Sequence, residues 1–264
     1  MDFMFPLVRF SKKDHLQELQ QGLMYMRNAG HYRAMQSESG NTIQGDQLES
    51  KLPYYSGNHM KKLLSTNNVS SDIVGHWSLM AANTFICCMY AFNESNIINR
   101  GENWITLGIE RGENDLIEFG DHALVICGVD RFIQSFNNIS INYSYKQQGH
   151  VQYHNLYDHE IADIVTEKYI SYLAHTDPKK TILPPEFIKD IKYEYQQEYR
   201  FVLNTGYSHE DAVNEYQGII KNDDIKIKIE DCTPHSFICS TEELLRRTLC
   251  LKWEEDMLKV GFSD

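Results

Sequence analysis

Four polar residues, Glu194, Gln196, Glu198 and Arg200, occupy alternate positions late in the chain. Alternate side chains of a β-strand point to the same face, so two carboxylates, an amide and a guanidinium would lie side by side. Such a row could form the floor of an active site, where a carboxylate stabilises positive charge that develops during a reaction. It could equally form a solvent-exposed sheet face, on which Glu/Arg pairs contribute little to stability.

The residues between these polar positions are mostly aromatic or aliphatic. They would form the opposite face of the same strand, with Gln197 as the one exception: Tyr193, Tyr195, Tyr199, Phe201 and Leu203. This alternation predicts a strand over residues 191–204 whose aromatic face packs against the core. We expect Tyr195, Tyr199 and Phe201 to be buried and Glu194 to be exposed.

Arg9 is a second residue whose position suggests chemistry. It lies between Val8 and Phe10 in the short apolar segment FPLVRF. A charged side chain in such a strand is costly unless it is paired or faces a ligand. Arg9 could form a salt bridge with a carboxylate such as Glu198, or donate two hydrogen bonds to a phosphate.

The segment around Arg9 predicts a strand, a helix and a second strand. Residues 5–10 form the first strand, Ser11 caps a helix over residues 12–21, Gly22 ends it, and residues 23–26 form the second strand. Farther along, the residues FICCMYAF predict a buried central strand, and HALVICGV predicts a strand followed by a short helix. Two amphipathic helices are expected over residues 157–175 and 241–258.

The composition is that of a globular protein with a sizeable core, because the 264 residues are 42% hydrophobic and 12% aromatic. No repeat or linker separates two cores. We therefore expect one α+β domain over residues 1–264, with a mixed, mostly antiparallel sheet of short strands and flanking helices. The polar residues 31–70 are expected to form a flexible loop region.

The charge balance restricts the partners, since 25 basic and 37 acidic residues give a net charge of −12. A broad nucleic-acid-binding surface would need clustered Lys and Arg. No signal peptide or apolar run long enough to span a bilayer is evident, so we expect a cytoplasmic protein without a membrane partner. The six cysteines form no CxxC pair and are expected to be small apolar residues.

Common catalytic motifs are missing from the sequence. Neither GxGxxG nor a P-loop occurs, which argues against Rossmann and P-loop enzymes, and no GxSxG elbow is present. His150 and His154 could hold a metal ion together with His159 and Glu160, but an exposed hairpin explains these residues better. No metal site is predicted.

Several of these features together resemble ADP-ribosyltransferases. The resemblance covers Arg9 in the first strand, the helix ending at Gly22, the strand at residues 23–26, and the Gln-x-Glu of Gln196 and Glu198. The middle Ser-Thr-Ser motif of that family is not evident, and Ser78, Thr84 and Ser135 are only candidates for it. The segments LVRFSKKDHLQELQQGLMYM, GDHALVICGVDRFI and YEYQQEYRFVL are also similar to a group of poorly characterised bacterial and phage proteins of unknown function.

The resemblance implies a mono-ADP-ribosyltransferase-like enzyme with NAD as substrate and a protein or nucleic acid as acceptor, acting as a toxin or in antiviral defence against phage. Glu198 would stabilise the transition state, Gln196 would orient the acceptor, and Arg9 would hold NAD. Tyr25 and Tyr32 are the further candidates for NAD binding, since an aromatic ring can stack on a base or on nicotinamide. We expect Arg9 and Glu198 to lie on adjacent strands at one cleft.

A different class of function is also compatible with the sequence. The acidic chain could be a non-enzymatic binding protein that inhibits or senses a host or phage factor. A large cavity containing Glu198 and Arg9 would favour the enzyme, whereas a flat face with both residues solvated would favour the binding protein.

Overall fold

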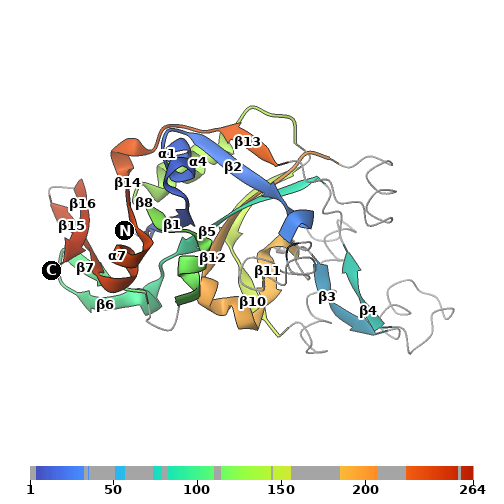
Figure 1. Cartoon of the computed structure of the whole chain (residues 1–264), viewed down its shortest axis with the longest axis horizontal. Coiled ribbons are helices and arrows are strands. Elements are labelled where there is room, and N and C mark those ends of the chain that lie inside the picture. The colour runs from blue at the N-terminus through green and yellow to red at the C-terminus, as the bar shows by residue number, and fades with distance from the viewer. Residues whose placement is uncertain are drawn as a thin grey trace.

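The fold is α+β, as predicted, with short strands in mostly antiparallel sheets and helices packed beside them (Figure 1). The computed structural model describes residues 4–32, 35, 51–56, 74–78, 83–109, 114–143, 145–155, 185–206, 224–254 and 257–263. Within these ranges, the parallel pairs are confined to β10 (Gln152–His154) with β11 (Ile188–Asp190). No helix in these parts of the chain is long and apolar enough to cross a membrane.

The largest sheet is organised around β5 (Thr84–Ala91). One edge of β5 pairs at residues 84–90 with β12 (Glu198–Asn204), which also pairs with β9 (Tyr145–His150). The other edge is shared, because β2 (Leu23–Asn28) pairs with residues 85–86 and β1 (Leu7–Ser11) pairs with residues 90–91. Between these two pairings, residues 87–89 have no partner strand on that edge among the described residues. The sheet is therefore forked at the middle of β5.

Each branch of the fork is extended by further strands. β13 (Ile225–Lys228) continues the β2 branch, whereas β8 (His122–Ile126) and β14 (Ser236–Ser240) continue the β1 branch. Helix α1 (Lys13–Gln20) connects β1 to β2, so a single short segment builds both walls of the fork.

The predicted strand, helix and second strand at the start of the chain are thus confirmed, and Gly22 ends the turn after the helix. Its φ of 90° favours glycine, and a Cβ there would lie 2.5 Å from the carbonyl oxygen of Ile229. The predicted cap is wrong, since Ser11 belongs to β1 and Lys12 precedes α1 without a side-chain hydrogen bond.

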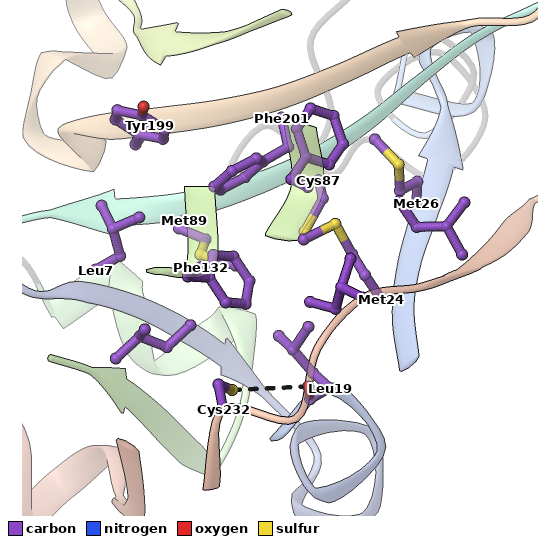
Figure 2. Packing of buried hydrophobic residues seen from close by; sticks show 14 of the residues in the cluster. Leu7, Leu19, Met24, Met26, Cys87, Met89, Phe132, Tyr199, Phe201 and Cys232 are labelled. Carbon is purple, nitrogen blue, oxygen red and sulfur yellow. Dashed lines mark hydrogen bonds between the residues drawn. The ribbon is translucent and has the colours of Figure 1, made fainter. Parts of the chain in front are cut away.

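One face of the forked sheet packs against α1 and α4 (Val129–Asn137). Phe201 packs among the other residues of this core (Figure 2) and has no exposed surface. Its ring centre is 5.3 Å from that of Phe132 and 5.0 Å from that of Phe136, both in edge-to-face geometry. Tyr199 and Leu203 share this face, as the alternation predicts from residue 198 onward.

The opposite face of the β1 branch packs against a second, four-stranded sheet. Its members come from the middle and the end of the chain: β6 (Ile97–Arg100), β7 (Trp104–Leu107), β15 (Thr248–Glu254) and β16 (Met257–Ser263). The predicted helix over residues 241–258 is therefore wrong beyond α7 (Thr241–Arg246). Leu249 and Leu251 are fully buried at alternate positions, so pairing with β7 determines the structure of this segment.

The predicted loop region includes a strand, since β3 (Lys51–Ser56) pairs with β4 (Val74–Ser78). Most of residues 31–70, and the whole of the helix predicted over residues 157–175, lie outside the described residues.

Replacing Phe201 by alanine should lower the free energy of unfolding by about 3–5 kcal/mol, because the ring is buried and surrounded by other aromatic rings. Chemical denaturation monitored by circular dichroism would measure the loss. Ile191→Ala is the control, since Ile191 is 43% exposed and its replacement should change stability little. An unchanged denaturation midpoint for Phe201→Ala would contradict the assignment of this face to the core.

Candidate functional site

The strand predicted over residues 191–204 is wrong in its first half. Ile191–Gln196 forms a 3-10 helix, η4, and Gln197 adopts a left-handed conformation with φ of 40° before β12 begins. The side chain of Asp190 accepts a hydrogen bond from the backbone N–H of Lys192 and so caps η4. As a result Glu194 is exposed and Tyr195 is only half-buried, whereas Tyr199 is buried as expected.

A cavity of about 920 Å³ lies at the fork of the sheet. All five residues predicted for the site line it: Arg9, Tyr25, Tyr32, Gln196 and Glu198. They come from β1, β2, the residues after β2, η4 and β12. The structure therefore brings together residues that are far apart in the sequence, in a cavity of the size typical of small-molecule sites.

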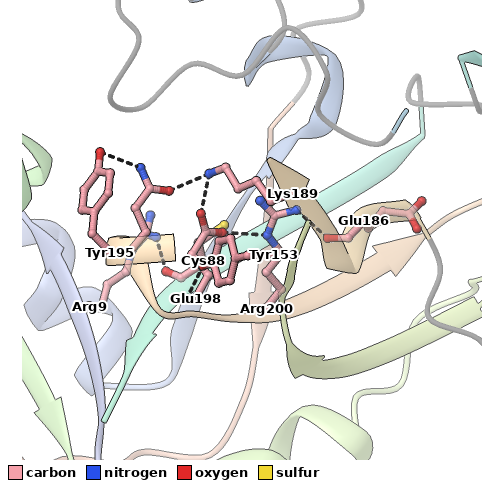
Figure 3. Close-up of polar contacts among 9 residues, drawn as sticks. Arg9, Cys88, Tyr153, Glu186, Lys189, Tyr195, Glu198 and Arg200 are labelled. Carbon is pink, nitrogen blue, oxygen red and sulfur yellow. Dashed lines mark hydrogen bonds and ion pairs between the residues drawn. The ribbon is translucent and has the colours of Figure 1, made fainter. Parts of the chain in front are cut away.

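Arg9 and Glu198 do not lie on adjacent strands, because β5 separates β1 from β12. Glu198 and Val8 are both aligned with Tyr90 of β5, so the side chain of Arg9, next to Val8, leaves the sheet on the face opposite Glu198. Its guanidinium then turns into the fork, where it donates a hydrogen bond to the carbonyl of Cys88 (Figure 3). Both side chains consequently reach one cavity from different faces of the sheet.

Glu198 is held between two buried cations, as Figure 3 shows. Its Oε1 accepts a hydrogen bond from Nζ of Lys189 at 2.5 Å, and its Oε2 accepts one from Nε of Arg200 at 2.7 Å. The exposed fraction is 4% for Lys189, 6% for Glu198 and 1% for Arg200. Of the polar row that might have been a solvated face, Gln196, Glu198 and Arg200 are therefore buried, with Glu198 and Arg200 in an ion-pair network.

Gln196 and the backbone of Glu186 also bond to this ion-pair network. Nζ of Lys189 also donates to Oε1 of Gln196 at 2.6 Å, and Arg200 donates to the carbonyl of Glu186. These contacts attach residues 186–196 to the polar face of β12, so the ion-pair network forms one wall of the cavity.

Burial alone would raise the pKa of Glu198, but the charges of Arg200 and Lys189 outweigh it and hold that pKa well below its usual range. The carboxylate is therefore ionised at neutral pH. The phenol of Tyr153 accepts the backbone N–H of Glu198 at 2.7 Å. Burial and the nearby Glu198 charge raise the pKa of Tyr153 far above its usual range, so this phenol stays neutral.

The lining of the cavity is more basic than the rest of the chain. Its described residues include seven Lys or Arg and five Asp or Glu, whereas the whole chain has a net charge of −12. Arg9 forms no ion pair with any described residue. Its guanidinium can therefore donate further hydrogen bonds to an anion in the cavity.

The remaining candidates are distributed differently. The hydroxyl of Tyr25, at the edge of the cavity, donates a hydrogen bond to the carboxylate of Asp224. The side chain of Tyr32 is half-buried. Thr84 and Ser135, two candidates for the middle transferase motif, bond other parts of the chain and do not line the cavity. Ser78 lies in β4.

Of the histidines considered for a metal site, His150 and His154 do not line the cavity. His150 packs edge-to-face on Tyr199 with ring centres 5.0 Å apart, and burial lowers its pKa. His159 and Glu160 lie outside the described residues. Within the described ranges, no group of three or more His, Cys, Asp or Glu residues is arranged to hold a metal ion.

Lys189 bonds two of the predicted site residues but was not itself predicted. Its sequence context, Phe-Ile-Lys-Asp-Ile, places a lysine in a short apolar segment, which is the same signal that drew attention to Arg9. Its partners could not be read from the sequence, because they depend on the pairing of β11 with β10.

Glu198→Gln should lower the free energy of unfolding at pH 7 by about 3–5 kcal/mol, because it leaves two buried cations without their shared anion. The stabilising effect of a lowered carboxylate pKa is present above the unfolded pKa, about 4.3, and is lost as the pH falls below it. The difference between wild type and variant should therefore shrink below about pH 4. Urea unfolding between pH 3 and pH 7 would measure it.

Glu194→Gln is the matched control for this comparison, since Glu194 is exposed. Its effect should stay within about 0.5 kcal/mol at every pH. A difference between wild type and Glu198→Gln that did not change with pH would argue against the ion-pair network.

The chain matches no protein-family model, no curated protein and no solved structure. The roles assigned through the resemblance to ADP-ribosyltransferases therefore remain predictions. The geometry of the cavity is the basis on which a function can be proposed.

Proposed function

We propose that the protein transfers ADP-ribose from NAD to a macromolecular acceptor in the cavity at the fork of the sheet. The observation that carries this proposal is that one cavity of about 920 Å³ contains a charged Glu198, Gln196, Arg9 and two tyrosines. Deep clefts with a few convergent polar groups and shifted pKa values are typical of active sites.

Binding of NAD would use the cationic lining of this cavity. Arg9 would donate hydrogen bonds to the pyrophosphate, a contact that suits a guanidinium because it presents several N–H groups in one plane. The rings of Tyr25 and Tyr32 would contact the flat nicotinamide or adenine group. The excess of basic over acidic residues in the lining supports an anionic ligand.

The reaction would break the bond between C1′ of the ribose and N1 of nicotinamide. The electron pair of that bond goes to nicotinamide, which leaves as a neutral molecule, and positive charge develops on the ribose. The Glu198 carboxylate would stabilise this charge, while Gln196 would orient the acceptor. The acceptor nucleophile then forms a bond to C1′ and loses its proton to solvent.

A second candidate function is a binding protein that inhibits or senses a host or phage factor without chemistry. It is favoured by the fact that both carboxylate oxygens of Glu198 already accept hydrogen bonds from internal cations. In that case the cavity would bind an anionic ligand, and Glu198 would serve only to hold the fold together.

The two candidates differ in the fate of NAD. With labelled NAD and a cell lysate, the wild-type enzyme should attach label to protein or nucleic acid. Glu198→Gln should lower the turnover rate by roughly 10²–10³-fold, the usual loss when one electrostatic contact to a transition state is removed. Glu194→Gln should be nearly as active as wild type.

Because Glu198→Gln is also expected to be less stable, these assays need a temperature at which circular dichroism shows all variants folded. NAD binding measured by calorimetry should change little in Glu198→Gln. Equal turnover by the Glu198 and Glu194 variants would exclude a catalytic role for Glu198, and an inactive wild type that still binds NAD would favour the binding protein.

Arg9→Met should weaken NAD binding by roughly 10–100-fold, since a hydrogen bond to a charged group contributes about 1.5–3 kcal/mol. Calorimetric titration of NAD would measure this change. Arg100→Met is the control, because Arg100 is exposed and lies outside the cavity. An unchanged affinity in Arg9→Met would contradict the role given to Arg9.

A further inference from the structure

Lys189 joins the two residues to which the proposed reaction assigns roles. Its Nζ donates to Oε1 of Gln196 at 2.6 Å and to Oε1 of Glu198 at 2.5 Å, and lies 4.5 Å from the ring centre of Tyr193. The side chain is buried and lines the cavity. An ammonium group can only donate hydrogen bonds, so both partners must present an oxygen to it.

We propose that Lys189 is a positioning residue that sets the orientation of the Gln196 amide and the charge of the Glu198 carboxylate together. This inference rests on the proposed transferase function. With its oxygen held by Lys189, the Gln196 amide directs its NH₂ group away from Glu198, where Nε2 donates to the hydroxyl of Tyr195 at 3.2 Å. Lys189 thus prevents the amide from rotating and competing for the carboxylate.

The backbone around Lys189 is fixed from two directions. In the parallel pair of β10 and β11, Lys189 is the partner of Tyr153, whose hydroxyl bonds the backbone N–H of Glu198. Three residues earlier, the carbonyl of Glu186 accepts a hydrogen bond from Arg200. The ammonium group is therefore held at Glu198 by the fold itself, and not by an adaptable surface side chain.

Among the described residues, the titratable groups near Glu198 come from five strands. Lys189 and Arg200 bond the carboxylate directly, and the others lie farther away: Arg9 of β1, Cys88 of β5 and Tyr153 of β10. Arg200 also supports the backbone at Glu186, so its removal would disturb more than charge. Lys189 is the cation whose replacement tests the charge and orientation of Glu198 most directly.

The test compares Lys189→Met, which removes the charge, with Lys189→Arg, which keeps it. Carboxyl ¹³C NMR would follow the titration of Glu198, whose pKa should rise by about 1–3 pH units in Lys189→Met because one opposite charge is lost. The acidic limb of the pH–rate profile for NAD cleavage should move upward by a similar amount. Lys189→Arg should restore most of the wild-type profile.

Lys192→Met is the matched control, since Lys192 is exposed, contacts the same Tyr193 ring at 4.8 Å and does not line the cavity. It should leave the Glu198 titration and the pH–rate profile unchanged. If Lys189→Met fails to fold, Lys189→Gln keeps a hydrogen-bond donor without the charge and replaces it in both measurements.

An unchanged Glu198 titration in Lys189→Met would overturn this inference, as would a Lys189→Arg variant with the pH–rate profile of Lys189→Met. Failure of the proposed function looks different, because the wild type would then not cleave NAD, whether or not it binds it. The NMR titration needs no activity, so it would still support or overturn the control of Glu198 by Lys189.

Discussion

The buried Glu198 carboxylate, shared between Lys189 and Arg200, is the interaction on which this part of the structure depends. Burying a charge without a partner costs several kcal/mol, and this one carboxylate bonds both cations. Each cation also reaches a second group, Gln196 for Lys189 and the Glu186 carbonyl for Arg200. One carboxylate thereby connects β12, β11 and η4, and these elements form the polar wall of the cavity.

The fork in the sheet provides the other walls. Since β1 and β2 pair with opposite ends of one edge of β5, the middle of that edge is open to side chains. Arg9 enters this gap and bonds the Cys88 carbonyl, whereas apolar cores fill both faces of the sheet around it. The gap is therefore a place where charged groups from both faces of a buried sheet can meet.

The low pKa of Glu198 restricts what this carboxylate can do. A carboxylate with a strongly lowered pKa is a weak general base near neutral pH, because proton transfer to it is unfavourable. It remains charged, however, and can stabilise a positive charge without accepting a proton. The same two cations that keep it charged also fix its position, so the site is organised before any ligand arrives.

Local sequence patterns determined a large part of this protein. Alternation from Glu198 to Asn204 placed Phe201 in the core, and the apolar residues around Arg9, with Gly22, predicted the strand, helix and second strand that form the fork. These patterns also identified Arg9, Gln196 and Glu198, which share one cavity. Such predictions succeed because side-chain alternation and glycine conformation depend on neighbouring residues.

Only the tertiary structure decided the rest. The strand predicted from residue 191 begins only at residue 198, after the 3-10 helix capped by Asp190 and the left-handed Gln197. Pairing with β7 made β15 a strand where a helix was predicted. The burial of Glu198 and its pairing with Lys189 both depended on the contact of β11 with β10. Charge partners and strand neighbours come from segments distant in the chain, and no local pattern encodes which of them will meet.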